Sequence, residues 1–394
     1  MTLSLAGLNP AAPADLRAWL METAMPFWAE AGIDRAHGGF IERLNPDRTQ
    51  SDDDYKRIRV QGRQIYVFAH AHMMDAPVPA LEVAREGFSF LVDRGWDRNR
   101  GGFYGRLSRA GEPLDPIKDF YDHAFILHGF AWLHRAGGDG DALDWAHRTM
   151  GYIDDAMAEP RWRGYREHAT GDAADVPTPR RQNPHMHLLE AVMAMFEATG
   201  DSAWLDRADR IVALLERHFF DPDTGTLGEY FTTDWKPAPG GKGAIVEPGH
   251  HFEWVWLLHR FAALSGDDRA LPIAEALHAF ALAHGVDGEP GMVPAAFDEV
   301  DRTGAILAGS KRLWPQSEAV KAFLARFERT GDPADRDAAL GHLAMMFGPY
   351  LAANHGVWRD QLSRDGKEIS DYIPSSTLYH LYLCIAETLR VLDR

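Results

Sequence analysis

The sequence predicts an all-α protein, an (α/α)6 barrel of about twelve helices with short β-hairpin-like connections. Three observations favour this fold class. Amphipathic helical patterns fill most of the chain, a short glycine-led segment recurs six times, and the recurrence runs from end to end. Inner helices would line the barrel axis and outer helices would cover them. An open solenoid is the alternative, but its repeats of about 34 to 47 residues are too short for this spacing.

The recurring segment starts with a glycine that precedes an aliphatic, aromatic or small residue. Its six occurrences are Gly39-Phe40, Gly102-Phe103, Gly164-Tyr165, Gly225-Thr226, Gly291-Met292 and Gly356-Val357. The gaps between successive glycines are 63, 62, 61, 66 and 65 residues. So even a spacing predicts one closed architecture, and we expect a single domain over residues 1–394.

The stretches between the glycine-led turns have the periodicity of amphipathic helix. Over residues 143–157, Leu143, Ala146, Met150 and Ile153 recur at intervals of three or four. The segments HGGFIERLNPDRTQ, RGGFYGRLSRAGEP and HGVWRDQLSRDGKE instead alternate in character and end in a polar turn, which is typical of short hairpins or extended loops. Each repeat is therefore predicted as a helix, a short extended segment and a second helix.

Composition excludes several classes of partner. The apolar fraction of 45% is enough for a large core, and the net charge of -17 argues against a nucleic-acid backbone or an anionic membrane. The N-terminal residues lack the features of a signal peptide, and no apolar run predicts a transmembrane helix. Cys384, the one cysteine, lies in an apolar helical pattern and is interpreted as a small buried side chain. A disulfide within the chain is impossible, and a cytoplasmic location is expected.

Six residues share a place in the repeat and form the candidate site. A step of 21 to 25 residues onward from each glycine reaches Arg63, His123, His187, His250, Trp314 and His380. Independent core histidines have no reason to keep phase, so we expect the four histidines to face one spot at one end of the ring. His185 and His251 fall off this phase and are interpreted as pocket-wall or loop residues.

Neighbouring polar residues support two of the histidines. Glu253 shares a helical face with His250 at the i+3 position, where a carboxylate can fix the imidazole tautomer. Asn183 and Glu190 lie four residues before and three residues after His187. Two long loops, residues 168–185 and 232–249, precede His187 and His250 and are candidate lids.

Histidines with an arginine suit proton transfer at a carbon beside a carbonyl, since an imidazole takes and returns a proton near neutral pH. Arg63 could hold the developing enediolate oxygen, and Trp314 could stack on a sugar face. No metal or other cofactor is expected, because His185 and His187 at i and i+2 point about 200° apart on a helix. Glycoside hydrolysis stays open, but it needs two facing carboxylates, and the matched positions hold histidines.

Five motifs carry a resemblance to a known family. VQGRQIYVFA (60–69), NPHMHLLEA (183–191), GHHFEWVWLL (249–258), RLWPQSEA (312–319) and PSSTLYH (374–380) resemble the N-acylglucosamine 2-epimerase superfamily, in its order and spacing. That superfamily includes N-acylglucosamine and cellobiose 2-epimerases and the metal-independent mannose and sulfoquinovose isomerases. The resemblance implies an (α/α)6 barrel and 1,2-proton transfer on a free sugar.

The resemblance also implies roles for individual residues. His250 and His380 match the catalytic histidines, with Glu253 as partner of His250. The substrate-binding positions are matched by Arg63, Asn183, His187 and Trp314, while His123 and Glu190 are added by phase and proximity. The sequences Gly-His-His-Phe-Glu and Ser-Ser-Thr-Leu-Tyr-His depart from the cellobiose epimerases and look more like the mannose isomerase branch.

The sequence thus leads to one hypothesis and several alternatives. We expect a cytoplasmic, metal-independent isomerase, a monomer or homodimer, that interconverts D-mannose and D-fructose, with lyxose and xylulose as a candidate second pair. A sugar 2-epimerase, a sulfoquinovose isomerase, a glycoside hydrolase and a non-catalytic sugar-binding protein are the alternatives. Arg180, Arg181 and Lys242 on the long loops could meet a phosphate or sulfonate, although loop cations are usually solvated.

Overall fold

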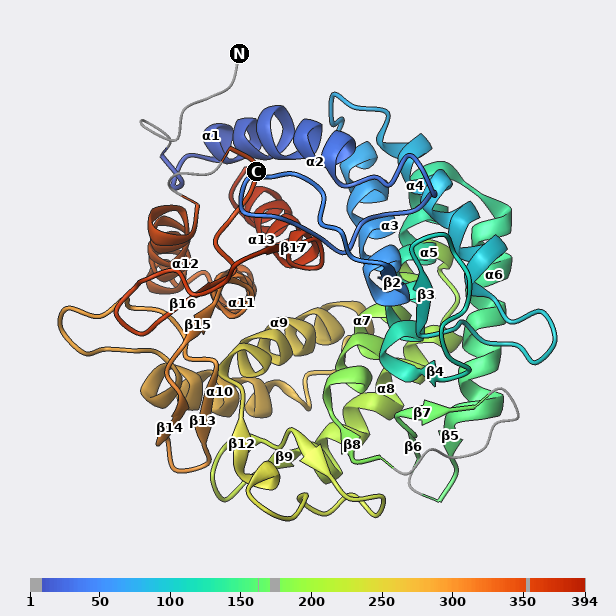
Figure 1. Cartoon of the computed structure of the whole chain (residues 1–394). Helices are drawn as coiled ribbons and strands as arrows, with labels where there is room; N and C mark the ends of the chain where they lie inside the picture. Colours follow the sequence, from blue (N-terminus) through green and yellow to red (C-terminus); the bar gives the residue numbers. More distant parts are fainter. Residues whose placement is uncertain (1–8, 162, 171–177, 352–354, 394) are drawn as a thin grey trace.

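Six inner helices form a closed ring in the computed structural model, which describes residues 9–161, 163–170, 178–351 and 355–393 (Figure 1). They are α3 (Ile58–Met73), α5 (Phe120–Gly137), α7 (Asn183–Thr199), α9 (Pro248–Ser265), α11 (Leu313–Thr330) and α13 (Thr377–Leu392). Each packs against the next, and α13 packs against α3, which closes the ring. The predicted (α/α)6 barrel is confirmed.

Outer helices cover the ring, each packed on the inner helix before it. They are α4 (Ala80–Phe90), α6 (Gly140–Tyr152), α8 (Ala203–Leu214), α10 (Leu271–Phe280) and α12 (Pro333–Met345), with α1 (Pro13–Ala18) and α2 (Met25–Ala31) in the sixth place. π-Helical turns end five of them, at Leu91–Gly95, Ile153–Met157, Leu215–Phe219, Ala281–Gly285 and Met346–Tyr350, and a sixth, Trp19–Ala24, joins α1 to α2. The sequence did not predict these turns.

Short strands link neighbouring repeats at the end of the barrel where the inner helices begin. The pairs across repeats are β1 (Arg43–Leu44) with β17 (Ile373–Pro374), β2 (Tyr55–Arg57) with β3 (Arg106–Ser108), β4 (Lys118–Asp119) with β7 (His168–Ala169), β8 (Arg180–Arg181) with β11 (Tyr230–Phe231), β12 (Ile245–Val246) with β13 (Glu299–Asp301), and β15 (Lys311–Arg312) with β16 (Gln361–Leu362). Hairpins within a repeat are β5 (Ala158–Glu159) with β6 (Gly164–Tyr165), β9 (Phe220–Asp221) with β10 (Thr226–Leu227), and β13 with β14 (Ile306–Ala308). The expected hairpin-like connections are therefore, in larger part, antiparallel ladders between repeats.

The recurring glycines lie in tight turns before each inner helix. Gly102 adopts a φ of 74°, which favours glycine, and a Cβ there would overlap the Tyr152 ring. Four other glycines of the series also have positive φ, whereas Gly164 lies within β6. The repeat in the sequence is thus a repeated backbone turn.

A polar side chain from each inner helix α3 to α11 holds this turn. The backbone N–H of Phe103 donates to His123 Nε2 at 2.9 Å, and that of Tyr165 donates to His185 Nε2 at 3.0 Å. Gln61, His251 and Gln316 accept equivalent bonds from Phe40, Leu227 and Ala296. We call these five residues the turn-holding set.

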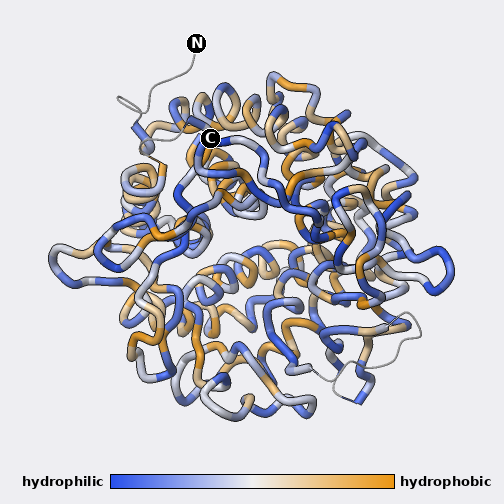
Figure 2. Tube along the Cα trace, viewed as in Figure 1, coloured by the Kyte–Doolittle hydropathy of each residue, from blue (hydrophilic) through white to orange (hydrophobic). Residues whose placement is uncertain are grey.

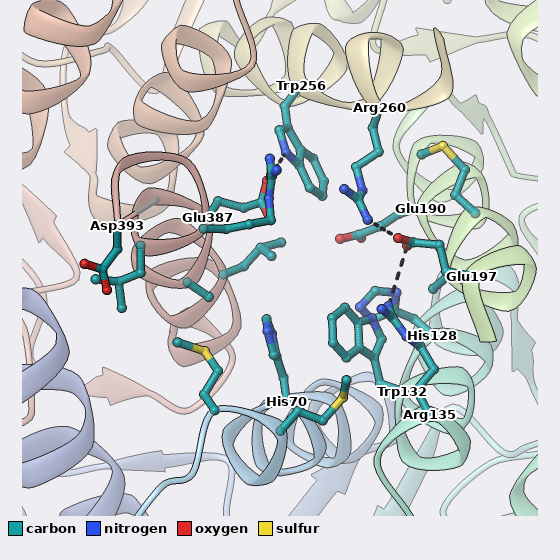
Figure 3. Close-up of a pocket in the computed structure, with 18 of the residues that line it drawn as sticks. His70, His128, Trp132, Arg135, Glu190, Glu197, Trp256, Arg260, Glu387 and Asp393 are labelled. Carbon is teal, nitrogen blue, oxygen red and sulfur yellow. Dashed lines mark hydrogen bonds and ion pairs between the residues drawn. The ribbon is translucent and has the colours of Figure 1, made fainter. Parts of the chain in front are cut away.

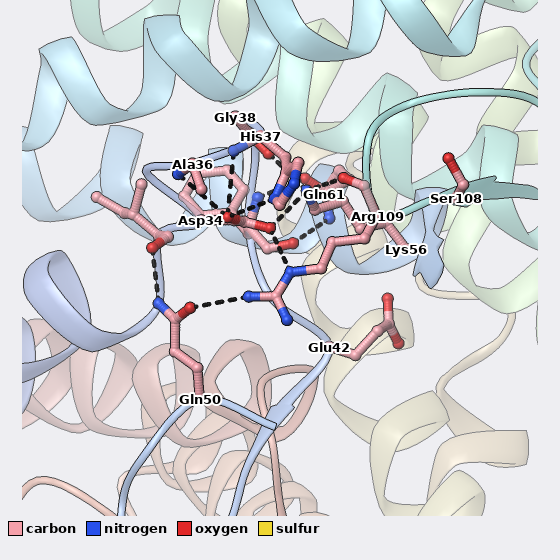
Figure 4. A network of polar contacts seen from close by, with 12 residues as sticks. Asp34, Ala36, His37, Gly38, Glu42, Gln50, Lys56, Gln61, Ser108 and Arg109 are labelled. Atoms are coloured by element: carbon pink, nitrogen blue, oxygen red, sulfur yellow. Dashed lines mark hydrogen bonds and ion pairs between the residues drawn. The ribbon is translucent and has the colours of Figure 1, made fainter. Parts of the chain in front are cut away.

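Buried ion pairs fix the connections further. Lys56 Nζ lies 3.0 Å from Asp34 Oδ2, and Arg109 Nε donates to the same oxygen at 2.8 Å (Figure 4). Equivalent pairs are Lys118–Asp97 at 3.1 Å, Arg180–Glu159 at 2.6 Å and Lys311–Asp287 at 2.8 Å. Arg180, expected as a loop cation, is therefore a buried structural residue.

The hydrophobic core lies between the inner and outer rings. Hydrophobic and hydrophilic residues alternate along the helices (Figure 2), and the buried apolar residues come from the inner and the outer helices. Cys384 is buried in α13, as predicted, and burial raises the pKa of its thiol. Among the described residues, no helix combines the length and apolar character needed to cross a bilayer.

Candidate active site

Five of the six in-phase residues converge near the N-terminal ends of the inner helices. They are Arg63 on α3, His187 on α7, His250 on α9, Trp314 on α11 and His380 on α13. Because the first N–H groups of a helix carry a partial positive charge, several helix ends here favour a developing negative charge.

His250 is oriented by a carboxylate from a neighbouring connection. Its Nδ1 lies 3.0 Å from Glu229 Oε2, and Gln182 Nε2 donates to the same oxygen at 2.9 Å. Gln182 in turn accepts from Trp254 Nε1 at 2.7 Å. The expected partner, Glu253, does not contact His250 and lies instead 3.8 Å from His187 Nδ1. A residue at i+3 on the same helix was the wrong choice because the imidazole turns toward β11.

His380 forms the second pair. Its Nδ1 lies 2.8 Å from Glu318 Oε1 on the adjacent α11. The other oxygen of Glu318 forms an ion pair at 2.6 Å with Lys321, which is fully buried and lies over the Trp256 ring. Lys321 thus compensates the carboxylate that orients His380.

His187 forms the third pair. Its Nδ1 lies 3.2 Å from Glu190 Oε2, as the spacing predicted. Tyr379, which precedes His380 on α13, donates its hydroxyl proton to the same carboxylate, at 2.5 Å from Oε1. This bond connects the walls that carry His187 and His380.

The three pairs share one arrangement. Each histidine directs Nδ1 to a buried glutamate, and its Nε2 has no hydrogen-bond partner within the described chain. An ionised glutamate only accepts hydrogen bonds, so we place the ring proton on Nδ1, and this choice of tautomer follows from the hydrogen-bond network. When the ring is neutral, Nε2 is left as a lone pair available to a substrate.

Electrostatics separates the two histidines expected to be catalytic. Burial lowers the pKa of His250, but Glu229 and Glu247 outweigh it and raise the pKa to about 9. Burial, with Arg63 and Lys321 nearby, holds the pKa of His380 well below its ordinary value. At neutral pH His250 is a protonated acid and His380 a neutral base. Such a divergence of pKa values is what paired acid–base catalysis requires.

Arg63 is the cation that the site leaves uncompensated. It donates to Tyr121 Oη at 2.8 Å and lies 4.0 Å from the Phe125 ring centroid, and within the described residues it contacts no carboxylate. Its Nε is buried without a hydrogen-bond partner in the same residues. By contrast, other arginines near the helix starts are paired, as in Arg57–Glu42, Arg59–Asp122, Arg181–Glu167 and Arg312–Asp298.

Trp314 and Asn183 complete the lining. The Trp314 ring lies between the two catalytic candidates, with its centroid 5.1 Å from that of His250 and 5.5 Å from that of His380. Asn183 begins α7, and its Oδ1 is buried without a partner in the described part of the chain. Both side chains remain available to a ligand.

His123 does not join the site, contrary to expectation. Its Nε2 accepts from Phe103, its Nδ1 faces the Asp119 carbonyl oxygen at 2.7 Å, and its ring stacks on Tyr152. Both nitrogens are therefore occupied, and burial lowers the pKa of His123 to about 4. His185, which was interpreted as a wall or loop residue, has the same structural role.

Several site residues were not in the predicted set, although one pattern could have revealed Glu229. Acidic residues stand three to seven positions after five of the recurring glycines, namely Glu42, Glu167, Glu229, Asp298 and Asp360. Glu318 lies within the motif RLWPQSEA but was not among the predicted site residues. Lys321 and Tyr379 carry no such pattern.

In the part of the chain that the structure describes, three groups of side chains have donor atoms close enough to hold a cation: His187 with Glu190 and Glu253, His250 with Glu229 and Glu247, and His380 with Glu253 and Glu318. The Nδ1 atom of each of these histidines already faces a carboxylate, and Lys321 neutralises Glu318.

Residues 171–177 of the first candidate lid lie outside the described residues. Residues 232–249 include β12 and the start of α9, and lid closure stays a prediction.

Comparison with known proteins identifies the class. The family model of N-acylglucosamine 2-epimerase matches residues 39–384. A mannose-6-phosphate isomerase of Rhizobium meliloti is 35% identical over 382 residues, with 95% of each chain covered. A cellobiose 2-epimerase of Bacteroides fragilis is 26% identical over 356 residues, with 87% of this chain and 88% of the relative covered.

The fold agrees with this similarity. The crystal structure of a D-mannose isomerase superposes with a TM-score of 0.87 at 23% identity, over 97% of this chain and 99% of the other. This chain, a helical barrel with paired histidines and glutamates at one end, is thus an enzyme of the sugar isomerase and epimerase class. The chain belongs to the N-acylglucosamine 2-epimerase family.

Proposed function

We propose that the protein is an aldose–ketose isomerase that interconverts D-mannose and D-fructose, with D-lyxose and D-xylulose as a second pair. One observation carries the proposal: a protonated His250 and a neutral His380 lie on either side of Trp314, and Arg63 has no carboxylate partner among the residues that the structure describes. This set supplies an acid, a base and a cation for one oxygen.

The reaction follows from these groups. His250 donates its proton to the ring oxygen and takes the proton of the C1 hydroxyl as the pyranose opens, which leaves an aldehyde and a protonated His250. His380 Nε2 then takes the proton from C2, which leaves a cis-enediolate whose C1 oxygen Arg63 stabilises. The same nitrogen returns the proton to C1 on the same face, while His250 gives its proton to the C1 oxygen and takes the proton of the C2 hydroxyl. Atoms and charge balance without a further reactant.

A free sugar is favoured over a phosphorylated one. The name of the Rhizobium meliloti relative includes a 6-phosphate. Here Arg181 is held by Glu167 and Arg312 by both Glu247 and Asp298, so neither offers an unpaired charge to a phosphate. Lys242 is exposed, and the structure gives it a long contact to Tyr230 alone among the described residues. Arg63 is needed at the reacting carbons.

A 2-epimerase is the second candidate, because His250 and His380 flank one space and could serve opposite faces of C2. Incubation of D-mannose in deuterated water, followed by NMR, separates the two reactions. The isomerase gives D-fructose, with deuterium at C1 only to the extent that the proton held by His380 exchanges with solvent, whereas an epimerase gives D-glucose with deuterium at C2 and no ketose.

The test of the proton shuttle is His380→Asn. We expect the rate of fructose formation to fall by about 10²- to 10⁴-fold, the usual contribution of one general base. Unchanged thermal unfolding shows that the variant is folded. Activity within tenfold of the parent contradicts the role of His380.

Metal independence is part of the proposal and is tested by exhaustive EDTA treatment. Full activity is expected afterwards, because charge compensation in the site comes from Arg63 and Lys321. Loss of activity that Mn²⁺ or Zn²⁺ restores would overturn it.

A further inference from the structure

A second cavity lies at the other end of the barrel axis, where the inner helices end (Figure 3). Its volume is about 460 Å³, within the range of sites for small molecules. Arg390, on its wall, lies ten residues beyond His380 on α13, which corresponds to about 15 Å along the helix axis. The cavity therefore lies at the opposite end of the barrel from the candidate active site, and Glu190, which pairs with His187, is the residue that lines both.

Charges on the cavity wall compensate one another. Arg135 and Arg260 pair with Glu197, and Arg390 pairs with Glu387. Arg17 lies 3.6 Å from Asp393 at the rim. Among these residues an anion or a cation would find no uncompensated opposite charge. The remaining carboxylate of the lining, Glu190, is already hydrogen-bonded to Tyr379 and His187, so the wall favours a neutral ligand.

Uncharged polar groups of the wall, in contrast, are unsatisfied. Both ring nitrogens of His128 and the indole N–H of Trp132 are buried and make no hydrogen bond within the described residues. The His128 side chain is 3% exposed, and burial lowers its pKa, so the ring is neutral. His70 on α3 is neutral for the same reason. Buried groups of this kind need a partner that both donates and accepts.

Aromatic and aliphatic surfaces complete the cavity. Trp132 and Trp256 come from facing walls, and Trp256 is fixed by its N–H bond to Glu387 at 3.1 Å (Figure 3). Met193 and Leu383 add apolar surface between them. Flat aromatic rings beside unsatisfied donors and acceptors suit a molecule with apolar C–H faces and many hydroxyl groups.

We propose that this cavity is a second binding site, specific for a neutral polyhydroxylated small molecule such as a hexose or hexitol. Its hydroxyl groups satisfy His128 and the Trp132 indole N–H, while its C–H groups pack on the apolar part of the lining. The site is independent of the proposed function, because it needs neither His250 nor His380.

The test uses protein labelled with 5-fluorotryptophan and observed by fluorine NMR, in which Trp132 reports on the cavity and Trp314 on the active site. Trp132→Phe and Trp314→Phe assign the two signals. D-Mannitol and D-mannose are titrated, and inorganic phosphate serves as the charged probe. We expect a saturable shift of the Trp132 signal with D-mannitol and none with phosphate.

Two variants show where the ligand binds. Ala194→Phe fills the cavity and should abolish the Trp132 response, whereas the Trp314 response to D-mannose remains. His128→Leu keeps the volume and should weaken D-mannitol binding by about tenfold or more, which serves if the filled variant does not fold.

The inference is overturned by a Trp132 signal that no polyol moves, by a response that His128→Leu leaves unchanged, or by a response to phosphate alone. A silent Trp314 signal, or absence of fructose, would instead count against the proposed function. The two failures are thus distinguishable in one set of spectra.

Discussion

Histidine occupies two kinds of position in the barrel wall, and the group that faces Nδ1 separates them. In His187, His250 and His380 that group is a glutamate, and Nε2 is left without a partner among the described residues. In His123 and His185 it is a backbone carbonyl, and Nε2 already accepts from a turn. The same side chain therefore serves proton transfer in one place and backbone geometry in the other.

Glu229→Gln tests the acid role of His250. Below pH about 9 His250 is protonated in the parent enzyme, so kcat/KM should fall as pH rises through that value. Removing the Glu229 charge lowers the pKa of His250 and should move this basic limb down by about 1 to 3 pH units. Rates measured from pH 5 to pH 10 test this, with Glu42→Gln, which lies against Arg57, as the control. An unmoved limb contradicts the assignment.

The sequence predicted which residues meet better than what each one does. Arg63, His187, His250, Trp314 and His380 converge, but His123 does not. The steps from each glycine to its candidate residue range from 21 to 25, and this spread exceeds the 3.6 residues of one helical turn. The spacing therefore does not distinguish a side chain that faces the barrel axis from one that faces the turns. Two residues after each member of the turn-holding set stand Arg63, Phe125, His187, Glu253 and Glu318, and each of these belongs to the site or contacts a residue of it.

At the scale of elements, each inner helix from α3 to α11 holds the turn that precedes it through one side-chain bond. That bond fixes the height at which the helix begins, and hence where its first-turn residues point. Turn and helix therefore form one unit, with the buried ion pairs beside them.

His123→Phe tests the turn-holding role against a catalytic one. The variant orphans the Phe103 N–H, which should reduce the free energy of unfolding by about 1 to 3 kcal/mol. Its kcat/KM should stay within about twofold of the parent. Urea unfolding and initial rates measure the two effects, and His187→Phe is the matched comparison. That second variant should lose about tenfold or more in kcat/KM. A catalytic loss in His123→Phe without a loss of stability would contradict this role.

Gly102→Ala tests the repeated turn. Alanine at a positive φ costs about 1 to 2 kcal/mol by itself. At Gly102 the new methyl group also overlaps Tyr152, whereas at Gly138, where φ is 66°, it meets open space. Gly102→Ala should therefore destabilise the protein clearly more than Gly138→Ala. Thermal unfolding of both variants decides this, and equal losses would exclude the crowding argument.

The sequence predicted where helices and short extended segments occur, but it did not predict which strands pair. Helical periodicity identified the helices because an amphipathic pattern is local. The ladders were not predictable, since β2 and β3 pair Tyr55 with Ser108, more than fifty residues apart. The π-turns at the outer helix ends also lack a local pattern that distinguishes them from α-helix.

At the scale of the whole molecule, the parallel inner helices polarise the barrel. Their positive ends face the site where an enediolate would form, and their negative ends face the second cavity, where Arg135, Arg260 and Arg390 gather. The single domain expected from the repeat is consistent with a ring that closes on itself, and closure follows from the packing of α13 against α3.

The seam of the ring has a consequence for chain connectivity. Near the two ends of the chain, Arg43–Leu44 pairs with Ile373–Pro374, and α1 packs on α13. The first and last repeats are therefore neighbours in the ring, and the chain ends could be moved to another connection while every repeat keeps the same neighbours. A circular permutant, with its old ends joined by a flexible linker and new ends opened between Gly200 and Asp201, should fold and retain parental turnover of its sugar. Failure to fold would show that the barrel depends on where its chain begins and ends.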